Sequence, residues 1–522
     1  MAGIRLSGLA SGIDTETMIK QLMQAERAPV DRLSQKKQTL TWQRDAYREM
    51  NRGLLDLRTA ASDMLLSKNY TSKTAASSDA SKVSVSASPA ATAGSVTIDK
   101  IGQLASAASV TMTTTAGNSS DTTLTASGMF TVTDGKINVQ INSFSANGTA
   151  ISETISLDST QKLSDLTSAI NDKASLGMSA VYNDITGKLV LTKTSTGKLN
   201  PNLNAPDITI LDANVGMEKV NSRVNGSGQD GVNAKYTIGG QELEQKTNTF
   251  TQNGLTITLN GTSTTATTIN TKLDTQANFD SIKKFVDKYN EMIDKMNKKV
   301  REEKYRDFQP LTDAQRKELS EDEVKKWEEK AISGVLKNDS FLRDGMNSFR
   351  SAISAKIDTG YSYTADSKTI ELNYMSQIGI TSTSDFRDGG KLKLDETKLK
   401  KMLEEQPEGV YKLFTADAPE PVKNPDGSIT PNPGGLDGFV RQIQGFATAM
   451  RDKISKVAGL DGAVATTYRL GKSLADVDKS MLTWEDKLTV KENAYYRRFA
   501  AMEQAMNQAN SQSATLASYL GQ

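Results

Sequence analysis

Apolar residues recur every seven positions near both ends of the chain, the pattern of helices that pair with other helices. Before the first stripe, Asp14 is the predicted N-cap of a short amphipathic helix, and Pro29 either ends that helix or begins the next one. The positions expected to pair the two stripes as a coiled coil are Leu33, Leu40, Tyr47, Leu54, Leu474, Met481 and Leu488. Two such stripes most simply cover each other, so the two ends of the chain are predicted to run side by side. A helical bundle within one molecule, with no role in assembly, explains the periodicity equally well.

The pattern changes between the helical ends. Residues 71–269 are rich in Ser, Thr, Asn and Gly and contain short stretches in which apolar and polar residues alternate. Turn sequences such as TDGK and SANG separate these stretches, which is typical of β-strands. A helical pattern interrupts them at 164–175, and a strongly amphipathic helix is predicted at 278–300.

These patterns predict an α+β multidomain fold in which long paired N- and C-terminal helices enclose inserted β-rich domains. The expected parts are terminal leg segments at 1–42 with 485–522, partly disordered in the free chain; a helical-bundle domain with a small β element at 43–70 with 271–484; a β-rich domain at 71–110 with 205–270; and a β-rich insert with one helix at 111–204.

The amino-acid composition excludes several classes of function but says less about the fold. The 522 residues include 63 basic and 62 acidic side chains, a formal net charge of +1, so no overall field attracts nucleic acid or an anionic membrane. The chain has no Cys and no His, which excludes thiolate nucleophiles, imidazole bases and metal sites built from these ligands. No apolar run approaches the roughly 18 residues of a membrane span, and the first residues lack the pattern of a secretory signal. We therefore expect no catalytic residue, metal or cofactor, no nucleic-acid partner and no membrane insertion.

Two motifs match chemical sites in their spacing alone. Residues 226–231 have the glycine spacing of a dinucleotide-binding turn, but they precede a strand-like run, whereas that site needs a strand before it and a helix after it. Residues 476–487 have carboxylates at calcium-like spacing, but they lack the required glycine and lie within a heptad stripe. Two distant carboxylates are enough for a hydrolytic site, yet the sequence singles out no such pair.

The segment before the first helix favours a role in assembly. Its apolar residues Leu6, Leu9 and Ile13 alternate with small residues, including Gly8 and Gly12. Each glycine costs about 1 kcal/mol if the segment becomes helical. We therefore expect this segment to be disordered in the free chain and to become ordered against a partner surface.

At this point the sequence resembles a known family. LSGLASGIDTETMIKQLMQAERAPVDRL at 6–33 closely resembles the N-terminal signature of the bacterial flagellar filament-cap family, hook-associated protein 2. YMSQIGIT followed by GGKLKLDETKLKKMLEEQPEGVYKLFT resembles a motif of that family's C-terminal half, and YYRRFAAMEQAMNQANSQSATLASYLG resembles its closing helix. The stretch at 164–197 is similar to a motif shared by flagellin, hook-associated and cap proteins.

The resemblance implies a structural assembly protein, not an enzyme, at the distal tip of the flagellum outside the cell. It would be exported by the flagellar type III apparatus without a cleavable signal peptide, and would form a ring of identical copies, usually a pentamer in this family. Its implied partners are flagellin, the hook-associated junction proteins, and the export apparatus with its export chaperone. The leg residues expected to contact filament subunits or neighbouring copies are Leu6, Leu9, Ile13, Met18, Ile19, Leu22, Met23, Tyr495, Met502, Met506, Leu516, Tyr519 and Leu520.

Two alternatives stay open at this stage. A hook–filament junction protein also has paired terminal helices, although the GLASGIDT opening and the IGIT and KLF blocks speak against it. A surface adhesin would instead bind host glycan or mucin through the β-rich domains.

Overall fold

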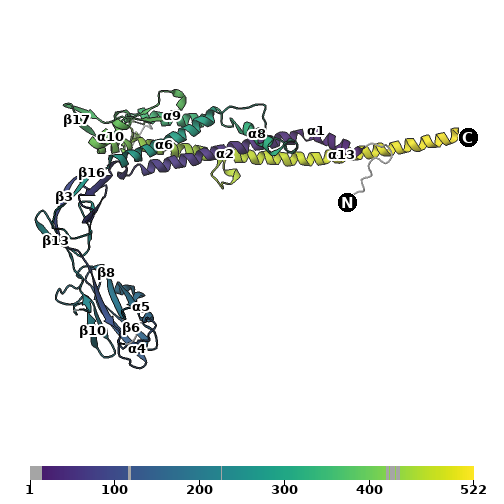
Figure 1. The fold of residues 1–522 in the computed structure, drawn as a ribbon. Coiled ribbons are helices and arrows are strands. Elements are labelled where there is room, and N and C mark those ends of the chain that lie inside the picture. The colour runs from purple at the N-terminus through teal and green to yellow at the C-terminus, as the bar shows by residue number, and fades with distance from the viewer. Residues whose placement is uncertain are drawn as a thin grey trace. The chain divides into compact units, whose positions relative to one another are not determined.

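Figure 1 shows the computed structural model, which describes residues 14–115, 119–224, 226–418, 422–423, 429–430 and 436–521. The chain separates into two compact units. The helical unit is formed by Met1–Tyr70 with Thr275–Gln522, and the β-rich unit by Thr71–Asp274. The β-rich unit is thus an insertion into the helical one, and the predicted α+β fold is confirmed. The finer four-part division stays a prediction.

The helical unit consists of long helices, short turns and small hairpins. Its helices are α1 Thr15–Glu26, α2 Ala28–Asp63, α3 Lys68–Thr71, α6 Thr275–Arg301, α7 Asp313–Glu318, α8 Glu321–Ile332, α9 Ser340–Ser354, α10 Glu396–Glu405, α11 Pro407–Thr415, α12 Phe439–Ala458 and α13 Arg469–Leu520. Its 3-10 turns are η2 Met375–Ile378, η3 Phe386–Asp388 and η4 Ala465–Thr467. Its antiparallel hairpins are β17 Ser362–Ala365 with β18 Lys368–Glu371, β19 Ile380–Ser382 with β20 Leu392–Leu394, and β21 Val422–Lys423 with β22 Ile429–Thr430.

The core of the helical unit lies where α2 packs against α6 and α12. Leu54 and Leu57 of α2 and Ile282 of α6 are almost completely buried there. They repeat at helical spacing, so each helix presents one apolar face to its neighbours. Tyr70 closes this core at the end of the N-terminal segment, with its ring 5.2 Å from that of Phe414.

The β-rich unit contains antiparallel sheets around two separate apolar cores. One core lies between a five-stranded sheet in the order β1-β16-β3-β12-β13 and a three-stranded sheet in the order β14-β15-β2. The strands are β1 Lys73–Ser77, β2 Val83–Ala87, β3 Gly94–Gln103, β12 Ala234–Ile238, β13 Gln241–Gln245, β14 Thr249–Gln252, β15 Leu255–Leu259 and β16 Thr267–Leu273.

The second core lies among sheets in the orders β10-β9-β5-β6 and β11-β4-β8-β7, together with α5. The elements are β4 Ala107–Thr113, α4 Leu124–Ser127, β5 Lys136–Phe144, β6 Ala150–Asp158, α5 Leu163–Asn171, η1 Ala174–Leu176, β7 Met178–Asn183, β8 Lys188–Thr196, β9 Thr209–Asp212, β10 Met217–Asn221 and β11 Gly228–Gln229. In β5, Ile137, Val139 and Ile141 are buried and the residues between them are partly exposed, as the alternating pattern predicts. The helix expected at 164–175 is observed as α5 and η1.

Candidate assembly surface on the terminal helices

The N-terminal helices α1 and α2 run antiparallel to the C-terminal helix α13. Near the outer end, the Tyr495 hydroxyl of α13 donates to Glu26 Oε1 at 3.1 Å, and Lys491 forms an ion pair with the same carboxylate. Further inward, Lys37 Nζ lies 2.6 Å from Asp478 Oδ1. As the residue number increases along the N-terminal helices, the number of the partner residue on α13 decreases, so the helices are antiparallel. The predicted side-by-side arrangement of the termini is confirmed.

Local sequence explains why the N-terminal helix begins and ends where it does. Asp14 is the N-cap of α1: its Oδ1 accepts from the Thr17 amide at 3.0 Å, and its Oδ2 accepts from the Thr17 hydroxyl at 2.6 Å. These hydrogen bonds lower the pKa of Asp14. Arg27 separates α1 from α2, and Pro29 lies in the first turn of α2, where its missing N–H costs nothing.

The residues expected to pair as a coiled coil lie in two environments. Tyr47, Leu54 and Leu488 are buried, whereas four others are only partly buried: Leu33, Leu40, Leu474 and Met481. Tyr47 and Leu54 belong to the core of the helical unit. The Tyr47 hydroxyl also donates to Asp339, the N-cap of α9, and burial raises the pKa of this tyrosine. The inner heptad positions Tyr47 and Leu54 thus contribute to a multi-helix core.

The predicted leg-contact residues also differ in exposure. Ile19 is buried within its own molecule, at 2% exposure. The partly buried ones are Met18, Met23, Tyr495 and Met506, and the exposed ones are Leu22, Met502 and Leu516. Leu6, Leu9 and Ile13 lie outside the described residues, as do the side chains of Tyr519 and Leu520. Contact of these residues with other subunits stays a prediction.

The helix α13 presents apolar side chains to solvent at several points along its length. Leu482, Val490 and Leu516 are 63%, 64% and 61% exposed. Figure 1 shows α13 continuing beyond α1, so its last turns extend past the helix that covers its earlier part. Heptad spacing does not mark Leu482 and Val490, because they lie off the paired stripe; their signal is that they are apolar on an otherwise polar face.

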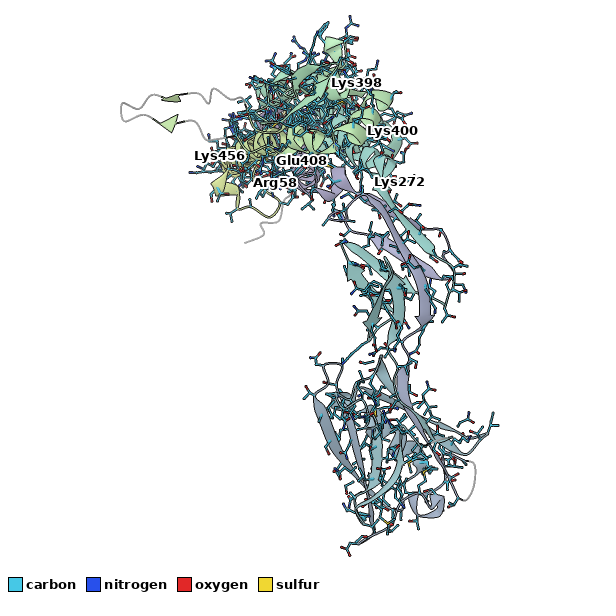
Figure 2. All side chains as sticks on the ribbon, turned by 90° about the vertical axis from the view of Figure 1, so that its left-hand side faces the viewer. Arg58, Lys272, Lys398, Lys400, Glu408 and Lys456 are labelled. Carbon is cyan, nitrogen blue, oxygen red and sulfur yellow. The ribbon has the colours of Figure 1, made fainter. Side chains whose placement is uncertain are left out.

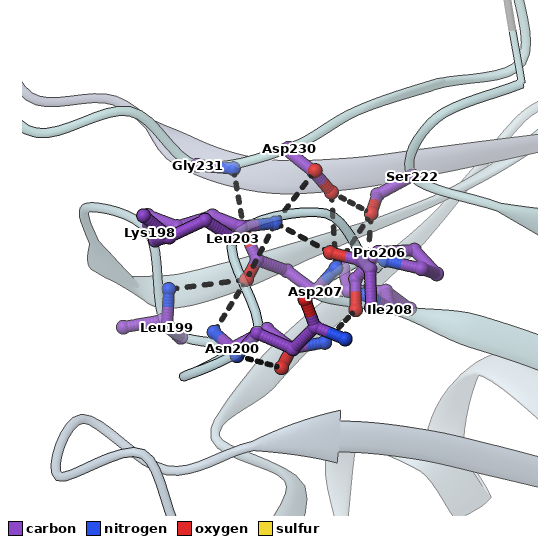
Figure 3. Close-up of polar contacts among 12 residues, drawn as sticks. Lys198, Leu199, Asn200, Leu203, Pro206, Asp207, Ile208, Ser222, Asp230 and Gly231 are labelled. Carbon is purple, nitrogen blue, oxygen red and sulfur yellow. Dashed lines mark hydrogen bonds and ion pairs between the residues drawn. The ribbon is translucent and has the colours of Figure 1, made fainter.

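A densely connected polar group lies in the β-rich unit (Figure 3). Asp207 is fully buried; its Oδ1 accepts from the Asn200 amide at 2.7 Å, and its Oδ2 accepts from the Gly231 amide at 2.8 Å. Lys198 Nζ lies 3.4 Å from Asp207 Oδ1 and 2.7 Å from Asp230 Oδ2. Both carboxylates accept hydrogen bonds from several donors. Lys198, Asp207 and Asp230, called the clamp below, therefore hold separate loops together, and neither carboxylate is left free for chemistry.

Burial alone would raise the pKa of Asp230, but the opposing hydrogen bonds are stronger. Donors from Lys198, Ser222 and Arg223 together lower this pKa to about 2. Among the residues that the structure describes, no three His, Cys, Asp or Glu side chains gather where they could hold a metal ion. None of the described helices is both long enough and apolar enough to cross a bilayer.

Regions that match known protein families extend over most of the chain. Residues 11–108 match the family described as flagellar hook-associated protein 2 N-terminus, and residues 231–511 match its C-terminus. Residues 143–195 match the flagellin hook IN motif.

Relatives and solved structures agree with these family matches. Flagellar hook-associated protein 2 of Halalkalibacterium halodurans is 33% identical over 98% of this chain and 99% of its own length. The Escherichia coli protein of the same name is 24% identical over 99% of this chain and 98% of its own length. The crystal structure of the D1-D2-D3 domains of the flagellar cap protein FliD from Escherichia coli has the same fold, with a TM-score of 0.55, 22% identity, and coverage of 83% of this chain and 99% of that one. The matches give no support to the adhesin alternative.

Proposed function

The chain belongs to the flagellar hook-associated protein 2 family, and we propose that it caps the distal end of the bacterial flagellar filament and promotes the polymerisation of exported flagellin. The observation that carries the proposal is the match to this family over both ends of the chain and 98% of its length. The solved relative from Escherichia coli is called a flagellar cap protein.

The terminal helices give this function a physical basis. A cap that stays at a growing tip must hold its filament while releasing it repeatedly, which favours several weak contacts over one strong contact. The apolar side chains exposed on α13, such as Leu516 and Met502, supply contacts of this kind. Methionine adapts to surfaces of different shape, which suits a ring whose symmetry differs from that of the filament. The contacts then confine flagellin sterically while it folds.

The same proposal names the partners and the location. The chain acts as a ring of identical copies, a pentamer in the simplest case, at the distal tip outside the cell. It is exported without a cleavable signal by the flagellar type III apparatus with an export chaperone. Its neighbours are flagellin and the hook-associated junction proteins. The β-rich domains form the plate of the cap and the paired terminal helices its legs.

Deletion of the gene in the source bacterium tests the capping role. We expect full-length flagellin to accumulate as soluble monomer in the medium while hooks remain on the cells. Normal filaments in the deletion strain would overturn the proposal.

Complementation of that strain tests the leg surface. The triple variant L482S/V490S/L516S removes exposed apolar side chains only, so it should fold and be secreted but restore few or short filaments. The matched control is Leu66→Ser, because Leu66 is 49% exposed in the same unit but lies after α2 and not on α13. Full restoration by the triple variant would remove these residues from the leg contacts.

A further inference from the structure

A basic pocket of about 130 Å³ lies between α2, α12 and the turn after α12. Arg48 and Arg52 line it from successive turns of α2, and Arg451 lines it from α12. Asp461 is the single carboxylate in this lining among the described residues. This pocket, called the arginine pocket below, therefore has an excess of positive charge.

Two of these arginines are fixed by contacts within the molecule. Arg48 Nε donates to the Ala458 carbonyl at 3.1 Å, and Arg451 Nε donates to Asn51 Oδ1 at 2.9 Å. These bonds use one N–H of each guanidinium and orient the rest of the group. The arginine pocket is thus organised before any ligand arrives.

The third arginine shows which ligand the arginine pocket prefers. Arg52 has a side chain that is 60% exposed, and its Nη1 lies 3.1 Å from Asp461 Oδ2. Arg48 Nη1 lies 3.8 Å from the other oxygen of the same carboxylate. Asp461 is itself 64% exposed on a turn, so it occupies the arginine pocket as a replaceable carboxylate.

Two apolar side chains also line the arginine pocket. Leu55 is 37% exposed and Leu460 is 52% exposed. Arginines beside exposed aliphatic residues match a partner surface on which carboxylates alternate with apolar side chains.

The chain itself carries such a surface on α8. This helix has five acidic and three basic side chains, and none of its residues is buried. Glu321 and Glu329 have no ion-pair partner among the described residues, whereas Glu328 pairs with Arg316. Val324 and Ile332 lie beside these acids. A groove of about 370 Å³ against Trp42 of α2 is lined by these two residues together with Glu321, Lys325, Glu328 and Glu329.

The two surfaces face different directions. Trp42 and Arg48 are six residues apart on α2, which places them about 120° apart around the helix axis. A contact between two unlike surfaces is head-to-tail, and such a contact closes into a ring when the rotation allows.

We propose that the arginine pocket of one copy binds the acidic face of α8 of a second copy. Carboxylates of Glu321 and Glu329 replace Asp461 at the arginines, and the aliphatic side chains beside the arginine pocket cover Val324 and Ile332. The contact rests on the self-association part of the proposed function and not on the capping role. Asp461 acts as an internal competitor that keeps the contact reversible.

Sedimentation velocity of the full chain over a range of concentrations tests the contact by charge reversal. Arg52→Glu should raise the dissociation constant of self-association about tenfold, and the pair E321K/E329K should raise it by a similar factor. Combining the two sets places the new carboxylate at position 52 opposite the new lysines while Arg48 and Arg451 stay in place, so self-association should recover in part. Asp461→Asn removes the competitor and should tighten association several-fold.

The control is Lys456→Glu: Lys456, which is labelled in Figure 2, is exposed on α12, and it is not one of the residues that line the arginine pocket. It should leave self-association unchanged. Higher salt should weaken association of the wild type more than that of Arg52→Glu. Circular dichroism and thermal unfolding should match the wild type for each variant, since every altered residue is exposed.

Two outcomes would overturn the contact, and they differ for the wider proposal. Self-association that is unaffected by Arg52→Glu and by E321K/E329K would place the interface elsewhere and leave the ring intact. Wild-type protein that stays monomeric at every concentration would remove both this contact and the ring. The capping role would then still be decided by the gene deletion.

Discussion

Acidic and basic side chains meet in both units of the molecule, but in opposite surroundings. In the β-rich unit, Lys198 and Asp207 are 3.4 Å apart, with side chains only 11% and 0% exposed. Along the terminal helices, Lys37 and Asp478 are 2.6 Å apart, with side chains 45% and 49% exposed. The shorter pair is the weaker one, because water competes for its charges and salt screens them.

The difference shows what each unit requires of its charges. A buried carboxylate must have every hydrogen bond satisfied, so the clamp around Asp207 fixes one arrangement of its loops. An exposed pair exchanges its partner for water at little cost. The β-rich unit thus uses charge for a fixed structure, and the terminal helices use it for contacts that can open.

The largest expected effect comes from breaking the clamp. Asp207→Asn removes a buried negative charge beside Lys198 and turns an amide donor toward backbone N–H groups that need an acceptor. We expect a loss of about 3 kcal/mol in the unfolding free energy of the β-rich unit, measured by denaturant titration. Asp478→Asn on α13 is the control and should change little. A loss below about 1 kcal/mol for Asp207→Asn would show that the clamp is not the stabilising feature described here.

Lowering the pH should also destabilise the buried clamp in the β-rich unit. The pKa of Asp230 is about 2 in the folded chain against an ordinary value of 3.8, because donors from Lys198, Ser222 and Arg223 outweigh its burial. Its contribution to stability is therefore complete above about pH 3.8 and is lost as the pH falls toward 2. Urea unfolding between pH 5 and 2 should show a decline that Asp230→Asn reduces. A decline that is equally steep in the variant would assign the acid sensitivity to other groups.

The exposed pair on the helices should contribute little. A double-mutant cycle of Lys37→Ala and Asp478→Asn is expected to give a coupling energy of about 0.5 kcal/mol, falling toward zero in 1 M salt. A coupling above about 2 kcal/mol that persists in salt would mean that this pair is as well shielded as the clamp.

The smallest effect is expected at the outer end of the helix pair. Glu26→Gln removes the charge that pairs with Lys491 and should leave global unfolding unchanged while it speeds hydrogen exchange in α1. The hydrogen bond from Lys491 lowers the pKa of Glu26. Protection of α1 should therefore be present above pH 4.5 and decrease as the pH falls through the lowered pKa. Unchanged exchange in the variant would show that apolar contacts alone hold α1.

Sequence periodicity predicted the helices and strands better than it predicted which residues are exposed on the surface. Heptad spacing predicted that the termini pair, and alternation at Ile137, Val139 and Ile141 predicted a strand with one buried face. Both are local patterns that the backbone geometry enforces. The heptads did not distinguish Leu54, which is in the multi-helix core, from Leu516, which is exposed, because that depends on which other helices arrive.

The clamp and the arginine pocket were not predicted from sequence. Lys198, Asp207 and Asp230 come from separate loops, and each is an ordinary charged residue in its own context. The arginine pocket combines α2 with α12, about 400 residues later, as the bond between Asn51 and Arg451 shows. Such sites arise from long-range folding and have no short motif.

The antiparallel pairing of the chain ends also sets the order in which the molecule can fold. Glu26 and Lys491 are 465 positions apart, so their contact closes almost the whole polypeptide into one loop. A strand pair such as β7 and β8 closes over a few residues and forms much faster. A chain that leaves a narrow channel with one end first therefore forms its β-sheets early, and its terminal helices pair last. Until its last segment emerges, such a protein has a structured centre and no legs.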